Sequence, residues 1–234
     1  MLSQLLSGNV SKFYIIQLLL SVPIILLSLS WHEAAHALAA SRLGDNTARN
    51  LGRLTLNPAK HLDPVGALLM LLFGFGYAKP VPINTRNMKN GKWGFVLSSL
   101  AGPASNLILA FAAAFLHRVY AVMVSYINIS NERTAIVVVI VDLFFMLAVS
   151  MNISLAIFNL LPVPPLDGSR LLTALLPRSM AMFVFRYERY FQMALMLLIF
   201  AGAFSNVLTN CVITVENVLY YVVDLIPFEL LAKI

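Results

Sequence analysis

An HExxH motif, His32-Glu33-Ala34-Ala35-His36, stands at the end of an uncharged apolar run that begins at Phe13. Residues four positions apart lie on one face of a helix, so His32 and His36 can bind one zinc ion together. Glu33 is then placed to polarise a water molecule for hydrolysis. In a soluble protein this motif indicates a metalloprotease. Here it lies in or beside an apolar segment, which predicts a hydrolytic centre within a lipid bilayer.

A catalytic zinc site needs a third protein ligand and one open position for water or substrate. Only His61 and His117 remain among the histidines, and the single cysteine, Cys211, excludes a cysteine-based site. We therefore expect a carboxylate ligand. The strongest candidate is Asp167, in the sequence Leu-Pro-Val-Pro-Pro-Leu-Asp-Gly, because the prolines end a membrane helix at the depth where the HExxH helix also ends.

The composition is that of an integral membrane protein. Hydrophobic residues make up 60% of the 234 residues and charged residues 11%, with a mean hydropathy of +0.84, whereas soluble domains carry about 25% charged residues. The net charge of +6 is explained by basic loops, so we expect no nucleic-acid partner. The chain is predicted to form one transmembrane domain, residues 1–234, with a core of about residues 12–176 and C-terminal helices in about residues 190–231.

Four apolar stretches are long enough to cross about 30 Å of hydrocarbon, namely residues 12–42, 93–116, 135–161 and 191–210. A fifth, residues 212–231, contains Glu216 and Asp224 and either spans the membrane or lies at its surface. The short run 65–77 has basic loops on both sides, so we expect it to enter the bilayer and return. The predicted fold is an all-α polytopic membrane protein with four to six membrane segments, a re-entrant segment and a short extended, β-like loop after the HExxH helix.

The distribution of basic residues predicts the orientation. With the N-terminus outside, 12 of the 16 lysines and arginines lie in cytoplasmic segments, and Lys233 is the thirteenth if the last segment crosses the membrane. The ends of the HExxH helix and of the third span then both face the cytoplasm. We therefore expect the active site on the cytoplasmic side, in a bacterial inner membrane.

The residues also carry a resemblance to a known family. HExxH paired with Asn-x-x-Pro-x-x-x-Leu-Asp-Gly more than a hundred residues later resembles the site-2 protease family of intramembrane zinc metalloproteases. Residues 101–106, Ala-Gly-Pro-Ala-Ser-Asn, resemble the Gly-x-x-x-Asn motif in that family's middle core span. Residues 52–64 and 78–84 are similar to the compact bacterial subgroup that has no PDZ domain. The resemblance covers about residues 12–176.

This resemblance implies a site and a mechanism. His32, His36 and Asp167 would bind one zinc ion per chain, and Glu33 would be the general base. Glu33 would take a proton from the attacking water and deliver it to the leaving amine. Residues 77–84, which are rich in proline, are expected to pair with an unwound substrate strand by edge addition.

Two asparagines admit more than one role. By the resemblance, Asn106 and Asn159 would donate amide hydrogen bonds to the substrate backbone or the developing oxyanion. The small residues around Asn106 equally suit close helix packing with the amide as an interhelical bond. Asn159 equally suits a bond to the backbone groups that are freed where the helix breaks.

Two other polar positions are open to alternatives. His61 and Asp63 suit a second metal site or, more simply, a turn before Pro64. Asp142 could mark a path for protons or water through the membrane. The simpler alternative is that it lies at the outer interface and bonds to a neighbouring residue.

The sequence thus predicts an intramembrane zinc endopeptidase that hydrolyses peptide bonds in or near transmembrane segments of membrane-anchored proteins. Regulated intramembrane proteolysis and the clearance of signal-peptide remnants both fit. The expected partners are transmembrane substrates and the bilayer, with no oligomeric state implied. A membrane zinc transporter and an inactive scaffold that binds membrane proteins are the alternatives.

Overall fold

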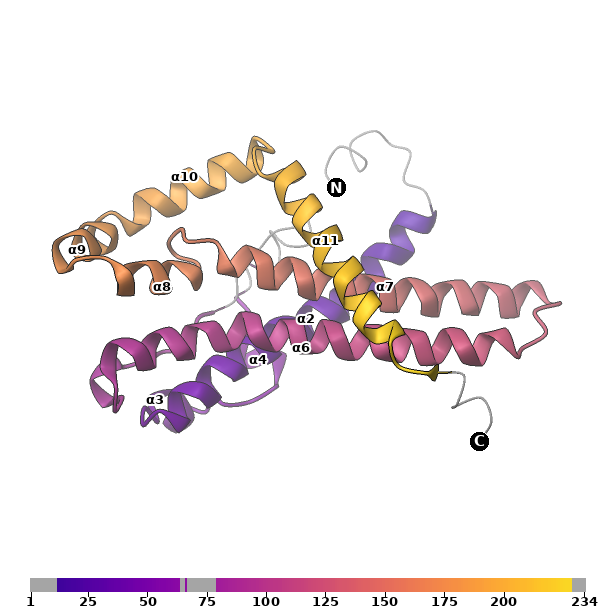
Figure 1. Ribbon diagram of the computed structural model, residues 1–234, viewed down its shortest axis with the longest axis horizontal. Helices are drawn as coiled ribbons and strands as arrows, with labels where there is room; N and C mark the ends of the chain where they lie inside the picture. The colour runs from indigo at the N-terminus through magenta and orange to yellow at the C-terminus, as the bar shows by residue number, and fades with distance from the viewer. Residues whose placement is uncertain (1–11, 64–65, 67–78, 229–234) are drawn as a thin grey trace.

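The computed structural model describes residues 12–63, 66 and 79–228, and the long elements in this part are all helices. Four of them are long and apolar enough to cross a membrane, namely α2 (Lys12–Arg42), α6 (Gly91–Ser125), α7 (Glu132–Leu160) and α11 (Ser205–Asp224). In Figure 1, α6 and α7 form a hairpin that α11 crosses, and α2 packs against both hairpin helices. The prediction of an all-α polytopic membrane protein is confirmed.

Short helices gather at the end of the bundle where α2 and α7 finish (Figure 1). They are α3 (Thr47–Asn50), α4 (Pro58–His61), the 3-10 helix η1 (Thr85–Asn87), α8 (Gly168–Leu175), α9 (Arg178–Arg186) and α10 (Glu188–Phe200). The predicted re-entrant run, residues 65–77, lies almost entirely outside the described residues. The segment that follows it, predicted as an extended loop, is described from Lys79, and neither helix nor strand forms between Lys79 and Asn84.

Local sequence signals fix the start and end of α7 and the end of α2. Helix α7 begins after Asn131, whose side-chain oxygen accepts a hydrogen bond from the amide of Arg133 at 2.9 Å. It ends at Leu160, because Pro162 cannot continue the helix. Helix α2 ends just before Gly44, which has a φ of 109° and lies too close to the Asn87 carbonyl for a side chain.

The predicted fourth span, residues 191–210, is wrong. The structure breaks this stretch after Phe200, and Gly202 has a φ of 70°, a left-handed conformation typical of a helix end. The helix of membrane-spanning length is instead α11, which overlaps the doubtful fifth segment. Apolar composition continues across the break, so hydropathy alone does not locate it.

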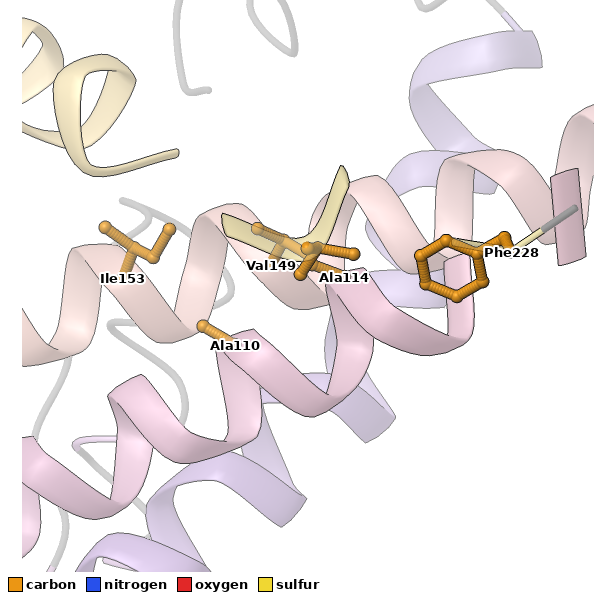
Figure 2. Packing of buried hydrophobic residues seen from close by; sticks show 6 residues of the cluster. Ala110, Ala114, Val149, Ile153 and Phe228 are labelled. Carbon is orange, nitrogen blue, oxygen red and sulfur yellow. The ribbon is translucent and has the colours of Figure 1, made fainter. Parts of the chain in front are cut away.

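The apolar core lies between α6, α7 and the end of the chain's described part. Ala110 and Ala114 of α6 face Val149 and Ile153 of α7, and Phe228 lies on the same cluster (Figure 2). The two alanines are fully buried. Small side chains one helical turn apart let the backbones of neighbouring membrane helices approach closely, so this core sets the spacing of the α6–α7 hairpin.

A buried carboxylate, Asp45, connects the end of α2 to the segment that precedes α6. It accepts hydrogen bonds from the backbone amide of Thr47, the backbone amide of Asn84 and the side-chain amide of Asn87. Burial alone would raise the pKa of Asp45, but these hydrogen bonds outweigh it and hold the pKa below its usual value. The charged carboxylate therefore stabilises the fold.

Replacement of Asp45 by Asn is expected to reduce the acid sensitivity of the protein. Because the folded-state pKa lies below the unfolded value of about 3.9, the stabilisation is present above that value and is lost as pH falls through the folded pKa. At neutral pH the variant should lose about 1–3 kcal/mol of unfolding free energy. Chemical unfolding in mild detergent between about pH 3 and pH 7 checks this; parallel stability curves for wild type and variant would contradict it.

Candidate metal centre

The three side chains of the HExxH motif are buried on α2. His32, Glu33 and His36 are 5%, 8% and 4% exposed. The two imidazoles lie one turn apart, and their Nε2 atoms are 3.0 Å from each other. The helix therefore brings two metal-ligating nitrogens to one point, as the spacing predicts.

Asp167 completes the cluster from the other end of the sequence. Its Oδ2 lies 3.1 Å from Nε2 of His32 and 3.1 Å from Nε2 of His36. Within the part of the chain that the structure describes, His32, His36 and Asp167 form a buried group whose ligand atoms lie within 4.8 Å of one another and could hold a metal ion. Their spacing is close to the edge of about 3.3 Å in a tetrahedron with zinc bonds of about 2.0–2.1 Å.

The hydrogen bond of His36 supports a cation at this point. Its Nδ1 lies 2.7 Å from the carbonyl oxygen of Ser98, and a carbonyl only accepts, so Nδ1–H donates. In a neutral ring Nε2 then carries a lone pair. That lone pair faces a second imidazole nitrogen and a carboxylate oxygen at about 3 Å, an arrangement of electron donors that a bound cation stabilises.

His32 is held from its other side by an asparagine. Its Nδ1 lies 2.9 Å from Oδ1 of Asn106, and Nδ2 of Asn106 donates to Oδ1 of Asn152 at 3.2 Å. Asn106 is fully buried. The sequence left two roles open for Asn106, a substrate contact or an interhelical hydrogen bond. The structure places it directly behind a candidate ligand, with an interhelical bond from α6 to α7. The sequence offered no pattern that singled out Asn152, which lies on α7.

Gly102 allows α6 to pass close to the cluster. A Cβ atom at this position would lie 2.4 Å from Nε2 of His36 and 2.6 Å from Cε1 of His32. No side chain fits there. The glycine of the Gly-x-x-x-Asn pattern therefore provides space for the imidazoles, while Asn106 one turn later provides a hydrogen bond to one of them.

A second glycine places Asp167. Helix α8 begins directly after Asp167, whose side chain makes no capping hydrogen bond and faces the imidazoles instead. A Cβ on Gly168 would lie 2.1 Å from the carbonyl oxygen of Leu160. This close approach lets α8 start against the end of α7, which brings Asp167 to the depth of the HExxH motif.

Glu33 is bonded to the non-helical segment between Lys79 and Asn84. Its Oε2 accepts a hydrogen bond from the backbone amide of Val81 at 2.9 Å. The Val81 side chain is buried against Ala37 and Ala48. One carboxylate oxygen is thereby fixed and the other has no hydrogen bond within the described residues, which leaves it for a proton.

An arginine lies beside the cluster on α8. Nη1 of Arg170 is 3.9 Å from Oδ1 of Asp167 and 3.2 Å from the hydroxyl of Ser99, and its guanidinium lies over the ring of Phe95. This cation faces the carboxylate oxygen that points away from the imidazoles. Sequence reasoning missed Arg170, although its position three residues after Asp167 on a helix was a usable signal.

The remaining predicted positions lie apart from the cluster or bond elsewhere. Nδ2 of Asn159 donates to the carbonyl of Leu155, one turn earlier in α7, at 2.9 Å, so in this structure it bonds within its own helix and away from the cluster. His61 lies 2.8 Å from the Thr55 carbonyl, and Asp63 accepts from the Gly66 amide, as the turn interpretation predicts.

Asp142 belongs to a separate polar group. Its Oδ1 lies 2.8 Å from Nε2 of His117, whose Nδ1 lies 2.8 Å from the Tyr220 hydroxyl. This group links α6, α7 and α11. It agrees with the simpler alternative for Asp142, a residue bonded to a neighbour.

Comparison with known proteins gives a consistent result. The profile of Peptidase family M50 matches residues 21–202. The chain is 45% identical over 166 residues to "Putative zinc metalloprotease YwhC" of Bacillus subtilis, and the alignment covers 71% of this chain and 73% of that protein. It is 33% identical over 154 residues to "Putative zinc metalloprotease Rip2" of Mycolicibacterium smegmatis. That alignment covers 61% of this chain and 52% of Rip2. The chain thus spans about half the length of Rip2, and no solved structure matches it.

Proposed function

This chain belongs to Peptidase family M50, and we propose that it cleaves peptide bonds in or near the transmembrane segments of other membrane proteins, with its active site on the cytoplasmic side. As a member of this family it is a membrane zinc metalloendopeptidase. The observation that carries the proposal is the convergence of His32, His36 and Asp167 on one point, buried between helices of membrane-spanning length.

In this proposal the three side chains hold the zinc ion. Zinc at this position supplies Lewis acidity, which activates water and polarises the scissile carbonyl. Glu33 accepts a proton from the attacking water and donates it to the leaving amine. The Val81 amide holds Oε2 of Glu33 in place, so the proton exchanges at Oε1.

The surroundings of the site support a substrate that is partly in the bilayer. Helix α2 carries the two histidines, α6 and α7 carry the asparagines behind them, and each of these helices is long enough to span a membrane. A substrate helix must expose its amides before cleavage, because backbone groups inside a helix are already paired. We propose that residues 79–84 receive the unwound strand and that Asn159, half-buried at the end of α7, contacts it.

The chain orientation in this proposal has the N-terminus outside. The basic residues of the segments between α2 and α6, and of α8 to α10, then lie in the cytoplasm. The membrane in question is proposed to be a bacterial inner membrane. Regulated intramembrane proteolysis and the clearance of signal-peptide remnants are the proposed settings.

Removal of zinc is expected to stop cleavage, and its return is expected to restore it. The test uses purified protein in liposomes with a tagged single-span test protein, a zinc chelator and added Zn²⁺. Mass spectrometry of the fragments should place the cut within or next to the span. Cleavage that survives the chelator, or cuts confined to distant soluble regions, would contradict the proposal. Zinc flux into the same liposomes without cleavage would favour the transporter alternative.

A further inference from the structure

We infer that Asn152 is a positioning residue of the metal centre, which acts through Asn106 to fix the ring orientation and the tautomer of His32. The inference rests on the proposed function, because it takes His32 to be a zinc ligand. It assigns a role in the site to α7, a helix that contributes no candidate ligand itself.

Asn152, Asn106 and His32 form a row of hydrogen-bonded side chains. The backbone carbonyl of Ala148, at one end of this row, fixes the direction of each hydrogen bond. Nδ2 of Asn152 lies 2.8 Å from the carbonyl oxygen of Ala148, and a carbonyl only accepts. The amide nitrogen of Asn152 must therefore face Ala148. Its Oδ1 then faces Asn106 and accepts from Nδ2 of that residue at 3.2 Å.

The same logic continues to the imidazole. With Nδ2 of Asn106 donating to Asn152, the remaining oxygen of Asn106 faces Nδ1 of His32 at 2.9 Å. An amide oxygen only accepts, so Nδ1–H of His32 donates. The lone pair of His32 is consequently on Nε2, the atom that faces His36 and Asp167. This is the tautomer that a ligand bonding through Nε2 requires.

Burial makes the row of hydrogen bonds rigid. Asn106 is 0% and Asn152 is 4% exposed. Water does not reach these amides to replace a lost partner, and an unpaired buried amide is unfavourable. If Asn152 is removed, Nδ2 of Asn106 loses its acceptor, and the amide of Asn106 can turn over and present nitrogen to His32. That orientation favours the wrong tautomer.

A packing role alone predicts something different. Asparagines between membrane helices also stabilise helix association, and loss of that contribution would lower stability without changing zinc affinity at the site. Zinc affinity and fold stability therefore separate the two roles. The neighbouring residue Ile153, fully buried in the apolar core and absent from the hydrogen-bonded row, supplies a matched packing control.

The experiment is a double-mutant cycle on full-length protein in detergent, with zinc affinity measured by competition with a chromophoric chelator. Asn106→Ala is expected to weaken zinc binding about 10- to 100-fold and Asn152→Ala about 10-fold. In the Asn106→Ala background, Asn152→Ala should add less than about a twofold change, because the effect passes through Asn106. Ile153→Val should lower thermal stability and leave zinc affinity within about twofold of wild type.

A second replacement guards against a folding defect. Asn152→Leu fills a similar volume and removes both polar atoms, and it should weaken zinc binding as Asn152→Ala does. If wild-type protein binds zinc and the folded Asn152 variants bind it with unchanged affinity, this inference is overturned and the proposed function still stands. Full-size, independent effects in both backgrounds would also overturn it. A wild-type protein that binds no zinc would overturn both proposals.

Discussion

Replacement of Glu33 by Gln is expected to lower peptide hydrolysis by about 10²- to 10⁴-fold, the contribution of a positioned general base. Gln has nearly the same size and keeps an oxygen that can accept from the Val81 amide. It cannot take up a proton at neutral pH. The zinc content should therefore stay at the wild-type level while the proton transfer is lost.

This variant is measured with the tagged test protein in liposomes, beside zinc analysis of the same preparation. Glu132→Gln, at the exposed start of α7, is the matched control and should cleave like wild type. Hydrolysis by Glu33→Gln within a few-fold of wild type would remove Glu33 from the mechanism. Loss of zinc from this variant would instead make Glu33 a ligand.

The second large effect is expected from Gly102→Ala. The added methyl group would lie 2.4 Å from Nε2 of His36, well inside contact distance, and it would meet the candidate ligand atom itself. Either α6 or the imidazoles must move. Since loss of a residue that only orients a ligand reduces metal affinity about 10- to 100-fold, we expect at least that loss here, together with loss of cleavage.

Gly91→Ala provides the control for the second variant. It is the same substitution in the same helix, and a Cβ at Gly91 has no atom within 4 Å. Zinc affinity and cleavage should be retained there. If Gly102→Ala bound zinc as tightly as wild type, the close packing of α6 on the imidazoles would not constrain the site, which would contradict the geometry described above.

Much of the fold followed from hydropathy. The first three predicted spans correspond to α2, α6 and α7, because each is a long apolar segment between polar loops. The fourth failed for a physical reason, since a left-handed glycine at Gly202 ends α10 within a continuously apolar stretch. Whether a glycine in such a stretch takes the left-handed conformation is decided by tertiary packing.

The cluster itself was predictable because the relevant signals were local. HExxH places two imidazoles on one helix face, and the prolines before Asp167 end α7 at the right depth. The structure brings all three predicted ligand side chains together. Their role as zinc ligands is a proposal, as is the general-base role of Glu33.

The supporting residues were harder to predict because their roles depend on contacts between distant elements. Asn152 occupies an ordinary position in an apolar helix, and only the pairing of α7 with α6 brings it to Asn106. The bond from the Val81 amide to Glu33 involves a backbone group, which no residue type reveals. Arg170 has partners on α6 that the sequence does not place.

The central claim is that Asp167 completes a zinc site with His32 and His36, and metal analysis of purified protein tests it most directly. Wild-type protein should contain one zinc ion per chain, and Asp167→Ala should lose stoichiometric zinc. Asp142→Ala, which removes a carboxylate that is bonded to a histidine outside the cluster, should keep it. One tightly bound zinc ion per chain in Asp167→Ala would contradict the account.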